Sequence, residues 1–257
     1  MKYFLSFLFT INTLVSVISF ANENLKVASI VEPPFSRIEN DTLVGFNVDV
    51  AEMLASSINL KPVIIQCPFA RCLTMLEQGS ADLMINLKKL PEREKNLIFI
   101  EPPLFVQDQP IRFYTLSNNN ISINKLTDLL PLVVGTIRGA TYFPEFDNNT
   151  KIRKVDFTTR EQLVNMLLKG RIDTFLEREE SIEPLISSQE YKDKMTIESY
   201  QYNKPVGSYI AISRNSSISK KAHELSIQVN KLIKTQVINQ LQAQHLPSEA
   251  LKPTLKK

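Results

Sequence analysis

The chain has 257 residues, and its 30 Lys and Arg against 27 Asp and Glu give a formal net charge of +3. A chain of this length can form one or two domains with a substantial hydrophobic core. The near-neutral charge argues against nucleic acid as a main partner, and the absence of Trp with only 6 Gly argues against a repeat or low-complexity protein.

The N-terminus has the pattern of a secretory signal peptide. Lys2 provides a basic start, and the run from Tyr3 to Phe20 carries no charge. The small residues Ser19 and Ala21, with Phe20 between them, precede the predicted cleavage site after Ala21. The alternative is a membrane anchor, because the uncharged run is just long enough to span a bilayer. Polar residues dilute the run and no basic cluster follows it, so we predict cleavage. No Cys lies near the junction, so we expect no lipid anchor and a free protein in the periplasm.

Strands and helices alternate through the first half of the chain. In order, we predict a strand at 25–31, a hairpin-like turn at 40–41, a helix to about residue 58, a strand at 63–66, an amphipathic helix that stops at Gly79 and a short strand at 81–85. Asn47 or Asp49 is the predicted cap of the first helix. A polar turn follows the last strand and ends in Pro91-Glu92-Arg93. Such alternation predicts βαβ units and a largely parallel sheet.

The second half repeats this alternation. We predict an extended segment at 105–116, a short helix at 126–130, a strand at 132–135 with a turn and a helix after it, a strand at 154–157, a helix at 160–169 and a strand at 172–176. Thr158 or Thr159 can cap the helix that Gly170 terminates. A second extended segment at 203–213 precedes helices at 219–234 and 237–243.

One pattern occurs in both halves: a helix, a Gly, two residues, an Asp and a strand, at 76–83 and again at 168–175. We therefore predict two α/β lobes with mixed, mostly parallel sheets and a hinge of two crossing segments. The predicted division is a signal peptide at 1–21, a discontinuous first lobe at 22–107 and 208–257, and a second lobe at 108–207. A ligand cleft between lobes is expected, because domain junctions are preferred small-molecule sites. A duplicated βαβ unit within one sheet is the alternative.

Arg93 follows a predicted strand at the end where open α/β sheets bind ligands. Its guanidinium offers a fork of donors that matches a carboxylate or phosphate. A surface arginine with a local ion pair is the alternative. Asp82 and Asp173 each precede a buried strand at equivalent positions, so we interpret them as capping or turn residues and predict no catalytic residues.

Cys67 and Cys72 would meet an oxidising compartment after export. A disulfide across a strand-to-helix corner and a pair of buried thiols are both compatible with their spacing. The two His residues, His223 and His245, are isolated on late helices, and no Cys/His set has the spacing of metal ligands. We expect no metal and no cofactor.

The residues together resemble the bacterial extracellular solute-binding proteins of the amino-acid type (family 3), which have the type II periplasmic binding fold. The resemblance covers residues 24 to about 246. It rests on motifs in a fixed order: Pro33-Pro34-Phe35, LVGFNVDV at 43–50, GSAD at 79–82, Pro91-Glu92-Arg93, Gly135-Thr136 and GRID at 170–173.

This resemblance implies roles for individual residues. Arg93 corresponds to the arginine that grips the ligand's α-carboxylate, and Phe69 to an aromatic residue that packs on the ligand. The backbone from Gly139 to Thr141, together with the Thr141 hydroxyl, corresponds to donors to the same carboxylate. Phe35 and Phe105 would flank the cleft, with core packing as their alternative.

The departures from the family pattern concern the ligand. Asn86 and Lys88 replace the usual Ser and Thr donors, and which of the two faces the cleft stays open. Arg178 stands where an ammonium-binding Asp is expected, with Glu177 beside it. Glu32 occupies a place often taken by an aromatic residue. Glu32 and Glu177 opposite Arg93 would suit a ligand with a cation and a carboxylate. Arg93 with Lys88, Arg178 and Arg138 would suit an anion, and solvated surface charge is the alternative for the last three.

The resemblance implies a monomeric periplasmic protein that captures an amino acid or related carboxylate for the membrane permease of an ABC-type transporter. A ligand-sensing domain for a membrane signalling protein is a second hypothesis. A dehydratase-like enzyme on the same fold is a third, with Glu177 and Glu32 as its only reasonable acid and base. We favour binding over catalysis.

Overall fold

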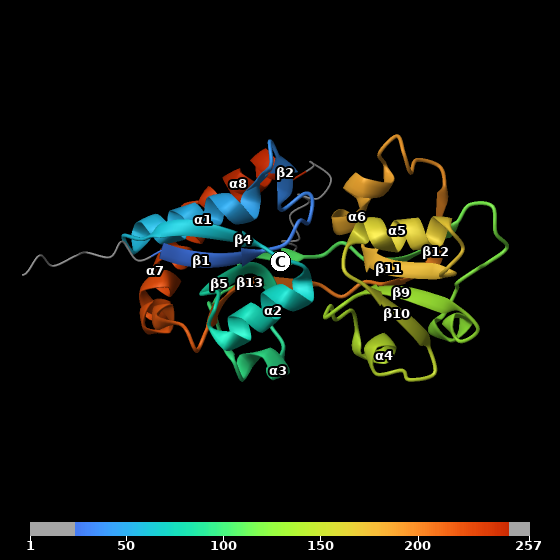
Figure 1. The fold of residues 1–257 in the computed structure, drawn as a ribbon, viewed down its shortest axis with the longest axis horizontal. Coiled ribbons are helices and arrows are strands. Elements are labelled where there is room, and N and C mark those ends of the chain that lie inside the picture. Colours follow the sequence, from blue (N-terminus) through green and yellow to red (C-terminus); the bar gives the residue numbers. More distant parts are fainter. Residues whose placement is uncertain (1–23, 247–257) are drawn as a thin grey trace, which may run out of the picture.

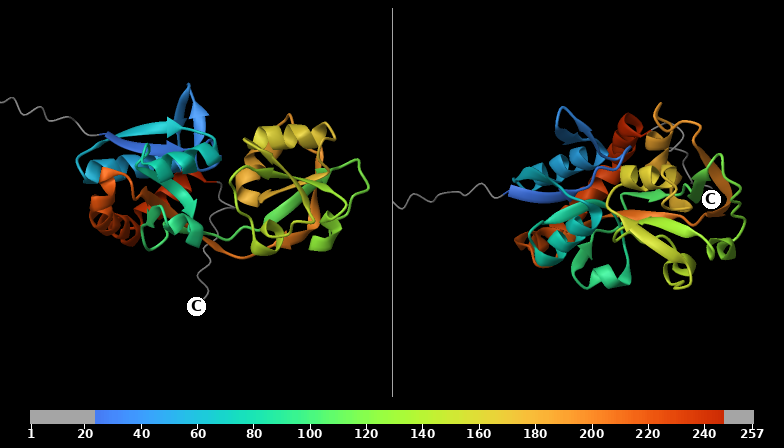
Figure 2. Two further views of the ribbon diagram at one scale, coloured as in Figure 1. Left: turned by 60° about the horizontal axis from the view of Figure 1, so that its bottom comes forward. Right: turned by 45° about the vertical axis from the view of Figure 1, so that its right-hand side comes forward.

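The computed structural model describes residues 24–246, which form two α/β lobes side by side (Figure 1). The predicted signal peptide lies outside the described residues. The chain leaves the first lobe after β7 (Phe105–Gln107) and returns to it at β13 (Val206–Ser213). The two crossing segments run side by side between the lobes, as the turned views in Figure 2 also show.

The first lobe contains a six-stranded sheet with the order β4-β1-β5-β13-β6, and β7 pairs with β13 beside it. β1 is parallel to β4 and β5, whereas β13 is antiparallel to β5, β6 and β7. The other strands of this sheet are β1 (Asn24–Ser29), β4 (Lys61–Gln66), β5 (Leu83–Lys88) and β6 (Leu97–Phe99). A separate hairpin of β2 (Arg37–Glu39) and β3 (Thr42–Val44) turns at Asn40 and Asp41, both with positive φ.

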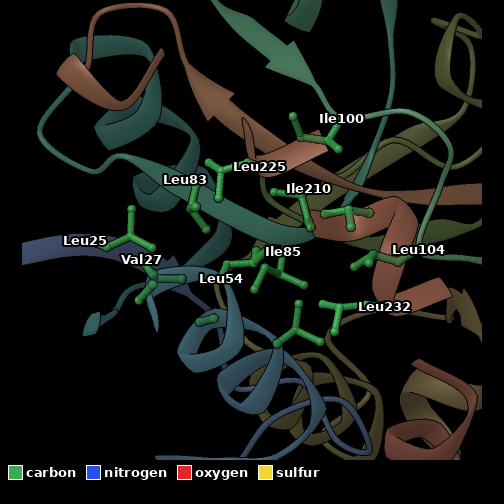
Figure 3. Packing of buried hydrophobic residues seen from close by; sticks show 14 of the residues in the cluster. Leu25, Val27, Leu54, Leu83, Ile85, Ile100, Leu104, Ile210, Leu225 and Leu232 are labelled. Atoms are coloured by element: carbon green, nitrogen blue, oxygen red, sulfur yellow. The ribbon is translucent and has the colours of Figure 1, made fainter. Parts of the chain in front are cut away.

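Helices cover both faces of this sheet. One face packs against α1 (Phe46–Ser57), α7 (Ala222–Lys234) and α8 (Val237–His245), with the 3-10 turn Ser217–Lys221 before α7. Figure 3 shows the apolar side chains of this layer, among them Leu25, Leu54 and Leu225, which are fully buried. The other face packs against α2 (Phe69–Gln78), and the short helix α3 (Pro91–Glu94) lies beyond it.

The second lobe contains a five-stranded sheet with the order β10-β9-β11-β8-β12. Its strands are β8 (Ile111–Leu116), β9 (Val133–Ile137), β10 (Arg153–Phe157), β11 (Thr174–Arg178) and β12 (Met195–Tyr202). β9, β10 and β11 are parallel, and β8 is antiparallel to its neighbours. One face packs against α5 (Arg160–Leu168) and α6 (Glu179–Ile186), the other against the 3-10 helix Leu126–Leu129 and α4 (Pro144–Asp147). The predicted fold class, a two-lobed α/β protein with mixed sheets, is confirmed, but parallel pairings do not predominate in either sheet, because β8 and β13 each run antiparallel to their neighbours.

The repeated Asp has the same structural role in both lobes. Asp82 accepts a hydrogen bond from the Lys26 backbone N–H at 2.7 Å, and its own N–H donates to the Lys26 carbonyl at 2.8 Å. Asp173 accepts from the Val133 N–H at 2.7 Å and donates to its carbonyl at 2.9 Å. Asp82 therefore ties the loop after a helix to the first lobe's β1, and Asp173 ties the equivalent loop to the second lobe's β9. This agrees with the prediction that both are capping or turn residues.

Several local predictions were wrong. Helix α1 begins at Phe46 with Gly45 as its N-cap, so neither Asn47 nor Asp49 caps it. The predicted turn before Arg93 is partly strand, because β5 continues to Lys88, and Pro91 then starts α3. The helix expected after β9 is only the four-residue α4, and both β12 and α6 were missed.

None of the helices among residues 24–246 is long and apolar enough to cross a membrane.

Candidate ligand-binding site

A cavity of about 390 Å³ lies between the lobes, and its walls come from both of them. The first lobe contributes the loop after β1, the start of α2, the end of β5 and Arg93. The second lobe contributes the turn after β9, the start of α5 and the end of β11. Most of these segments follow strands of the two sheets at their carboxyl ends, where open α/β sheets bind ligands.

Arg93 is buried in the wall of this cavity, with 8% of its surface exposed. Its Nη1 donates to the Lys88 carbonyl at 2.9 Å, and its Nη2 reaches across the lobes to the Gly139 carbonyl at 3.4 Å. None of the ion pairs among residues 24–246 involves this guanidinium. Burial lowers the pKa of Arg93 to about 10. A buried cation without an anionic partner is costly, so the site favours an incoming anion.

The ring of Phe69 lies beside Arg93, with the guanidinium carbon 5.5 Å from the ring centroid. Phe69 is the first residue of α2, and it too lines the cavity. The preceding corner is closed by a disulfide between Cys67 and Cys72. This bond ties the end of β4 to α2, and thereby fixes the segment that presents Phe69 to the cavity.

A bulge in β5 lies where this strand reaches the cavity. Asn86 has a φ of 63°, and the pairing with β13 shifts register between Tyr209 and Ala211. A bulge re-aims side chains locally, and both Asn86 and Lys88 line the cavity. The Asn86 Oδ1 accepts from the Ser208 hydroxyl at 2.6 Å, whereas the Lys88 Nζ donates to the Tyr142 carbonyl at 3.2 Å across the lobes.

The turn after β9 faces Arg93 from the second lobe. Gly139 has a φ of 81°, and a Cβ at this position would lie 3.3 Å from Ala70 at the start of α2. Glycine therefore permits both the left-handed backbone and the close approach of the lobes. Thr141 and Tyr142 line the cavity, whereas Gly139 contributes its carbonyl to Arg93 from just outside the lining.

Arg160 joins two carboxylates that come from different lobes. Its Nη2 lies 2.8 Å from Glu32 Oε1 in the first lobe and 3.1 Å from Glu177 Oε2 in the second. The Ser181 hydroxyl adds a hydrogen bond to Glu32 Oε1 at 3.3 Å. Arg160 is the first residue of α5, after the N-cap Thr159, whose side chain accepts from the Gln162 N–H. This Glu32–Arg160–Glu177 cluster bridges the lobes at one side of the cavity.

Burial has opposite effects on the members of this cluster. Burial raises the pKa of Glu32, while the positive charge of Arg160 lowers it in part. Burial alone would lower the pKa of Arg160, but the charges of Glu177 and Glu32 raise it above its ordinary value. Arg160 therefore stays charged, and both carboxylates are bound within the protein.

Arg178 ends β11 and lines the cavity, where it donates to the Gln109 carbonyl in the crossing segment. Burial lowers the pKa of Arg178, and the nearby charges of Glu180 and Glu177 oppose this effect. A cation thus stands at the place where the resemblance predicts an ammonium-binding Asp.

The structure brings together most of the predicted site residues, and ligand contact by them remains a prediction. Those that line the cavity are Arg93, Phe69, Glu32, Asn86, Lys88, Thr141, Glu177 and Arg178. Phe35 is not among them, because it is buried in the first lobe's core and stacks on Phe105 with ring centroids 5.4 Å apart. Arg138 is exposed and also lies outside the lining, which agrees with the alternative interpretation of Arg138 as a solvated surface charge.

Sequence reasoning missed Arg160, Tyr142 and Ser181. The Tyr142 hydroxyl accepts from the Ile137 N–H at 2.9 Å and lies 3.5 Å from Glu177 Oε1. Arg160 had a usable signal, because a charged residue directly after a helix cap that follows a parallel strand lies at the ligand-binding edge of the sheet. Tyr142 and Ser181 had no such signal. No group of three or more His, Cys, Asp or Glu among residues 24–246 could hold a metal ion.

Two sheet-based lobes with a charged cavity between them, and a buried arginine aimed into it, define a two-lobed ligand-binding protein. The chain matches the model of the bacterial extracellular solute-binding proteins, family 3, over residues 25–245, and it belongs to that family. Its function is therefore that of a solute-binding protein, and the family is not an enzyme family. The predicted resemblance is confirmed.

One curated relative is "Probable amino-acid-binding protein YxeM" of Bacillus subtilis (strain 168), which is 24% identical over 147 residues. The match covers 56% of this chain and 54% of the relative, so it spans about half the length of that protein.

Similar solved structures share the fold. A mutant of ArgBP from T. maritima aligns with a TM-score of 0.73 at 19% identity, covering 86% of this chain and 94% of that one. An ancestral arginine-binding protein bound to arginine aligns with a TM-score of 0.74 at 20% identity, covering 88% and 100%. A periplasmic binding protein of Salmonella typhimurium with high arginine specificity aligns with a TM-score of 0.71 at 16% identity, also covering 88% and 100%.

Proposed function

We propose that the protein captures a small metabolite with a carboxylate, an amino acid or a related acid, between its two lobes. The observation that carries this proposal is Arg93: a buried guanidinium in the cavity wall, without an ion pair among residues 24–246. A hydrogen bond to a charged group contributes about 1.5–3 kcal/mol, so a guanidinium fork with further donors supports micromolar affinity, which corresponds to about 8 kcal/mol. Relatives that are named as amino-acid-binding proteins agree with this chemistry.

Closure of the lobes would couple binding to conformation. We propose that residues 22–107 and 208–257 form the first lobe, that residues 108–207 form the second lobe, and that the hinge lies in the two crossing segments. The contacts from Arg93 to Gly139, from Lys88 to Tyr142 and from Glu32 to Arg160 exist only when the lobes meet. A ligand that touches both walls would add to them and shift the population toward the closed form.

We further propose that the protein acts as a monomer in the periplasm, after removal of residues 1–21, and presents its closed form to the permease of an ABC-type transporter.

We propose that the protein has no catalytic activity. Glu32 and Glu177 are the candidate acid and base for a dehydratase-like reaction, and Arg160 is paired with them at 2.8 and 3.1 Å. This arrangement suits fixed ion pairs better than proton transfer.

A thermal-shift screen tests the proposal. The mature protein is heated with each member of a panel of amino acids and small organic acids, and with the carboxamide of each acid. A ligand at 100 times its Kd adds about 2.7 kcal/mol of stability, which gives a clear rise in melting temperature. We expect at least one acid to raise the melting temperature and its carboxamide to have no effect. Equal effects of acids and carboxamides would remove the carboxylate from the proposal.

A further inference from the structure

The charged side chains that line the cavity do not form a balanced set. The cationic ones are Lys88, Arg93, Arg160 and Arg178, and the anionic ones are Glu32, Glu161 and Glu177. Glu161 is exposed, so the surrounding water weakens the electrostatic effect of its charge on a ligand in the cavity. The buried part of the lining therefore carries more positive than negative charge.

The two buried carboxylates are already bound inside the protein. Arg160 holds Glu177 through both Nε at 3.3 Å and Nη2 at 3.1 Å, and the same Nη2 holds Glu32 at 2.8 Å. A ligand ammonium at either carboxylate would have to compete with the Arg160 guanidinium. This guanidinium is already held in place by the fold, whereas the ligand loses conformational and translational entropy when it binds. It would also approach the cation Arg178. Among the buried side chains of the lining, neither carboxylate is thus open to an ammonium, and the remaining carboxylate, Glu161, is exposed.

Lys88 is a further cation of the lining outside the ion pairs, whereas the negative charges of Glu180, Glu177 and Asp108 lie near Arg178. Its Nζ donates to the Tyr142 carbonyl at 3.2 Å, and the ion pairs among residues 24–246 do not include it. Burial lowers the pKa of Lys88, Asp147 opposes this, and the charges of Arg93 and Arg178 lower it further. An ammonium carries three donors, so Lys88 has capacity for an anion beyond its one carbonyl.

Lys88 and Arg93 belong to the same wall. Arg93 Nη1 donates to the Lys88 carbonyl at 2.9 Å, and both side chains extend to the same short segment of the second lobe, at Gly139 and Tyr142. A volume of about 390 Å³ lies near the small end of ligand cavities, which run from about 300 to 1,000 Å³. A cavity of this size suits a small ligand that carries an acid group at each end.

We propose that the natural ligand is an organic dianion, a short dicarboxylate with one acid group on Arg93 and the other on Lys88, and without a binding site for an ammonium group. This inference rests on the proposed function, since it specifies the ligand class of the same cavity. It departs from an amino acid as ligand, because the second charge replaces the ammonium as the second point of recognition.

Isothermal titration calorimetry on the mature protein tests this inference. The probes are succinate and glutarate, the monoamide of each, glutamate and glutamine. The variants are Lys88→Gln, Lys88→Arg and Arg93→Gln, with Lys89→Gln as the control. Lys89 is the adjacent lysine but lies outside the cavity lining, and its Nζ is paired with Glu101 at 2.7 Å.

We expect one of the dicarboxylates to bind at least tenfold more tightly than its monoamide. Lys88→Gln should remove most of this difference, Lys88→Arg should keep it because the charge remains, and Lys89→Gln should leave it unchanged. Arg93→Gln should weaken binding of the dicarboxylate and the monoamide alike. Circular dichroism of each variant confirms that it is folded.

The possible failures are distinguishable. If glutamate or glutamine binds through Arg93 while the dicarboxylates bind no better than their monoamides, the dianion inference is wrong and the proposed function stands. If none of these probes binds but another acid of the thermal-shift panel binds through Arg93, the dianion inference is again wrong and the proposed function stands. If no acid of that panel binds, or if its binding does not depend on Arg93, both are wrong. A dicarboxylate preference that persists in Lys88→Gln would also overturn the role of Lys88.

Discussion

Glu180→Gln should stabilise the protein at pH 8 and leave its stability unchanged near pH 4.5. Glu180 is the second residue of α6, and its Oε1 is buried without a hydrogen-bond partner among residues 24–246. Burial raises the pKa of this carboxyl from 4.5 to about 7, which the charge of Arg178 opposes and that of Glu32 reinforces. The folded protein therefore holds the Glu180 proton more tightly than the unfolded chain does.

The magnitude follows from this shift in pKa. Because the folded state binds the proton more tightly, the stability from Glu180 is fully present below about pH 4.5 and is lost as the pH rises to about 7. One pKa unit corresponds to about 1.36 kcal/mol, so the loss is at most about 3 kcal/mol. Glutamine resembles the protonated carboxyl in shape and cannot ionise, so Glu180→Gln should avoid this loss.

Urea unfolding followed by circular dichroism, at several pH values from 4.5 to 8.5, measures the effect. The free energy of unfolding of Glu180→Gln should exceed that of the wild type by about 1–3 kcal/mol at pH 8, with the difference vanishing toward pH 4.5. Glu145→Gln, at an exposed glutamate of α4, is the matched control and should show no such trend. A Glu180→Gln difference that is independent of pH would refute the reasoning.

Two further predictions concern the walls of the cavity. Arg160→Met should lower the free energy of unfolding by about 3–5 kcal/mol, measured by urea unfolding at neutral pH, because it leaves Glu32 and Glu177 buried without their cation. The double variant Arg160→Met/Glu177→Gln should recover part of this loss. A loss below about 1 kcal/mol in Arg160→Met would show that the cluster is not buried as described. Replacing both Cys67 and Cys72 by Ser should lower the free energy of unfolding by about 2 kcal/mol under oxidising conditions, since the disulfide closes a short loop between residues five apart in sequence. If the variant and the wild type are equally stable under both oxidising and reducing conditions, the result would count against the disulfide.

Patterns that depend on neighbouring residues were readable from the sequence. The alternation of strands and helices predicted both sheets, and Gly79 marks the end of α2 with a φ of 73°. The extended segment predicted at 203–213 contains β13, which spans 206–213. Arg93 was predicted to lie at the cavity because its motif follows a strand. In each case the signal is local, so a single sequence contains it.

The features that were missed depend on contacts between distant residues. β12 is an edge strand with mostly exposed or half-buried residues, so it has no apolar run to reveal it. At the bulge, Asn86 is bound by Ser208 on β13, 122 residues away. Both Asn86 and Lys88 line the cavity, although the sequence analysis expected only one of the two to face it. The ion pair of Glu32 with Arg160 joins residues 128 apart. No spacing rule connects such partners before the lobes are assembled.

The central claim is that the cavity between the lobes binds a carboxylate through Arg93, and calorimetric titration of Arg93→Gln tests it most directly. The ligand is the acid with the largest effect in the thermal-shift screen, and Arg138→Gln, at an exposed arginine outside the cavity, is the matched control. Loss of a charge-assisted fork should weaken binding by at least tenfold, or about 1.4 kcal/mol, in a variant that remains folded. Arg138→Gln should bind as the wild type does. An unchanged affinity in folded Arg93→Gln would contradict the account.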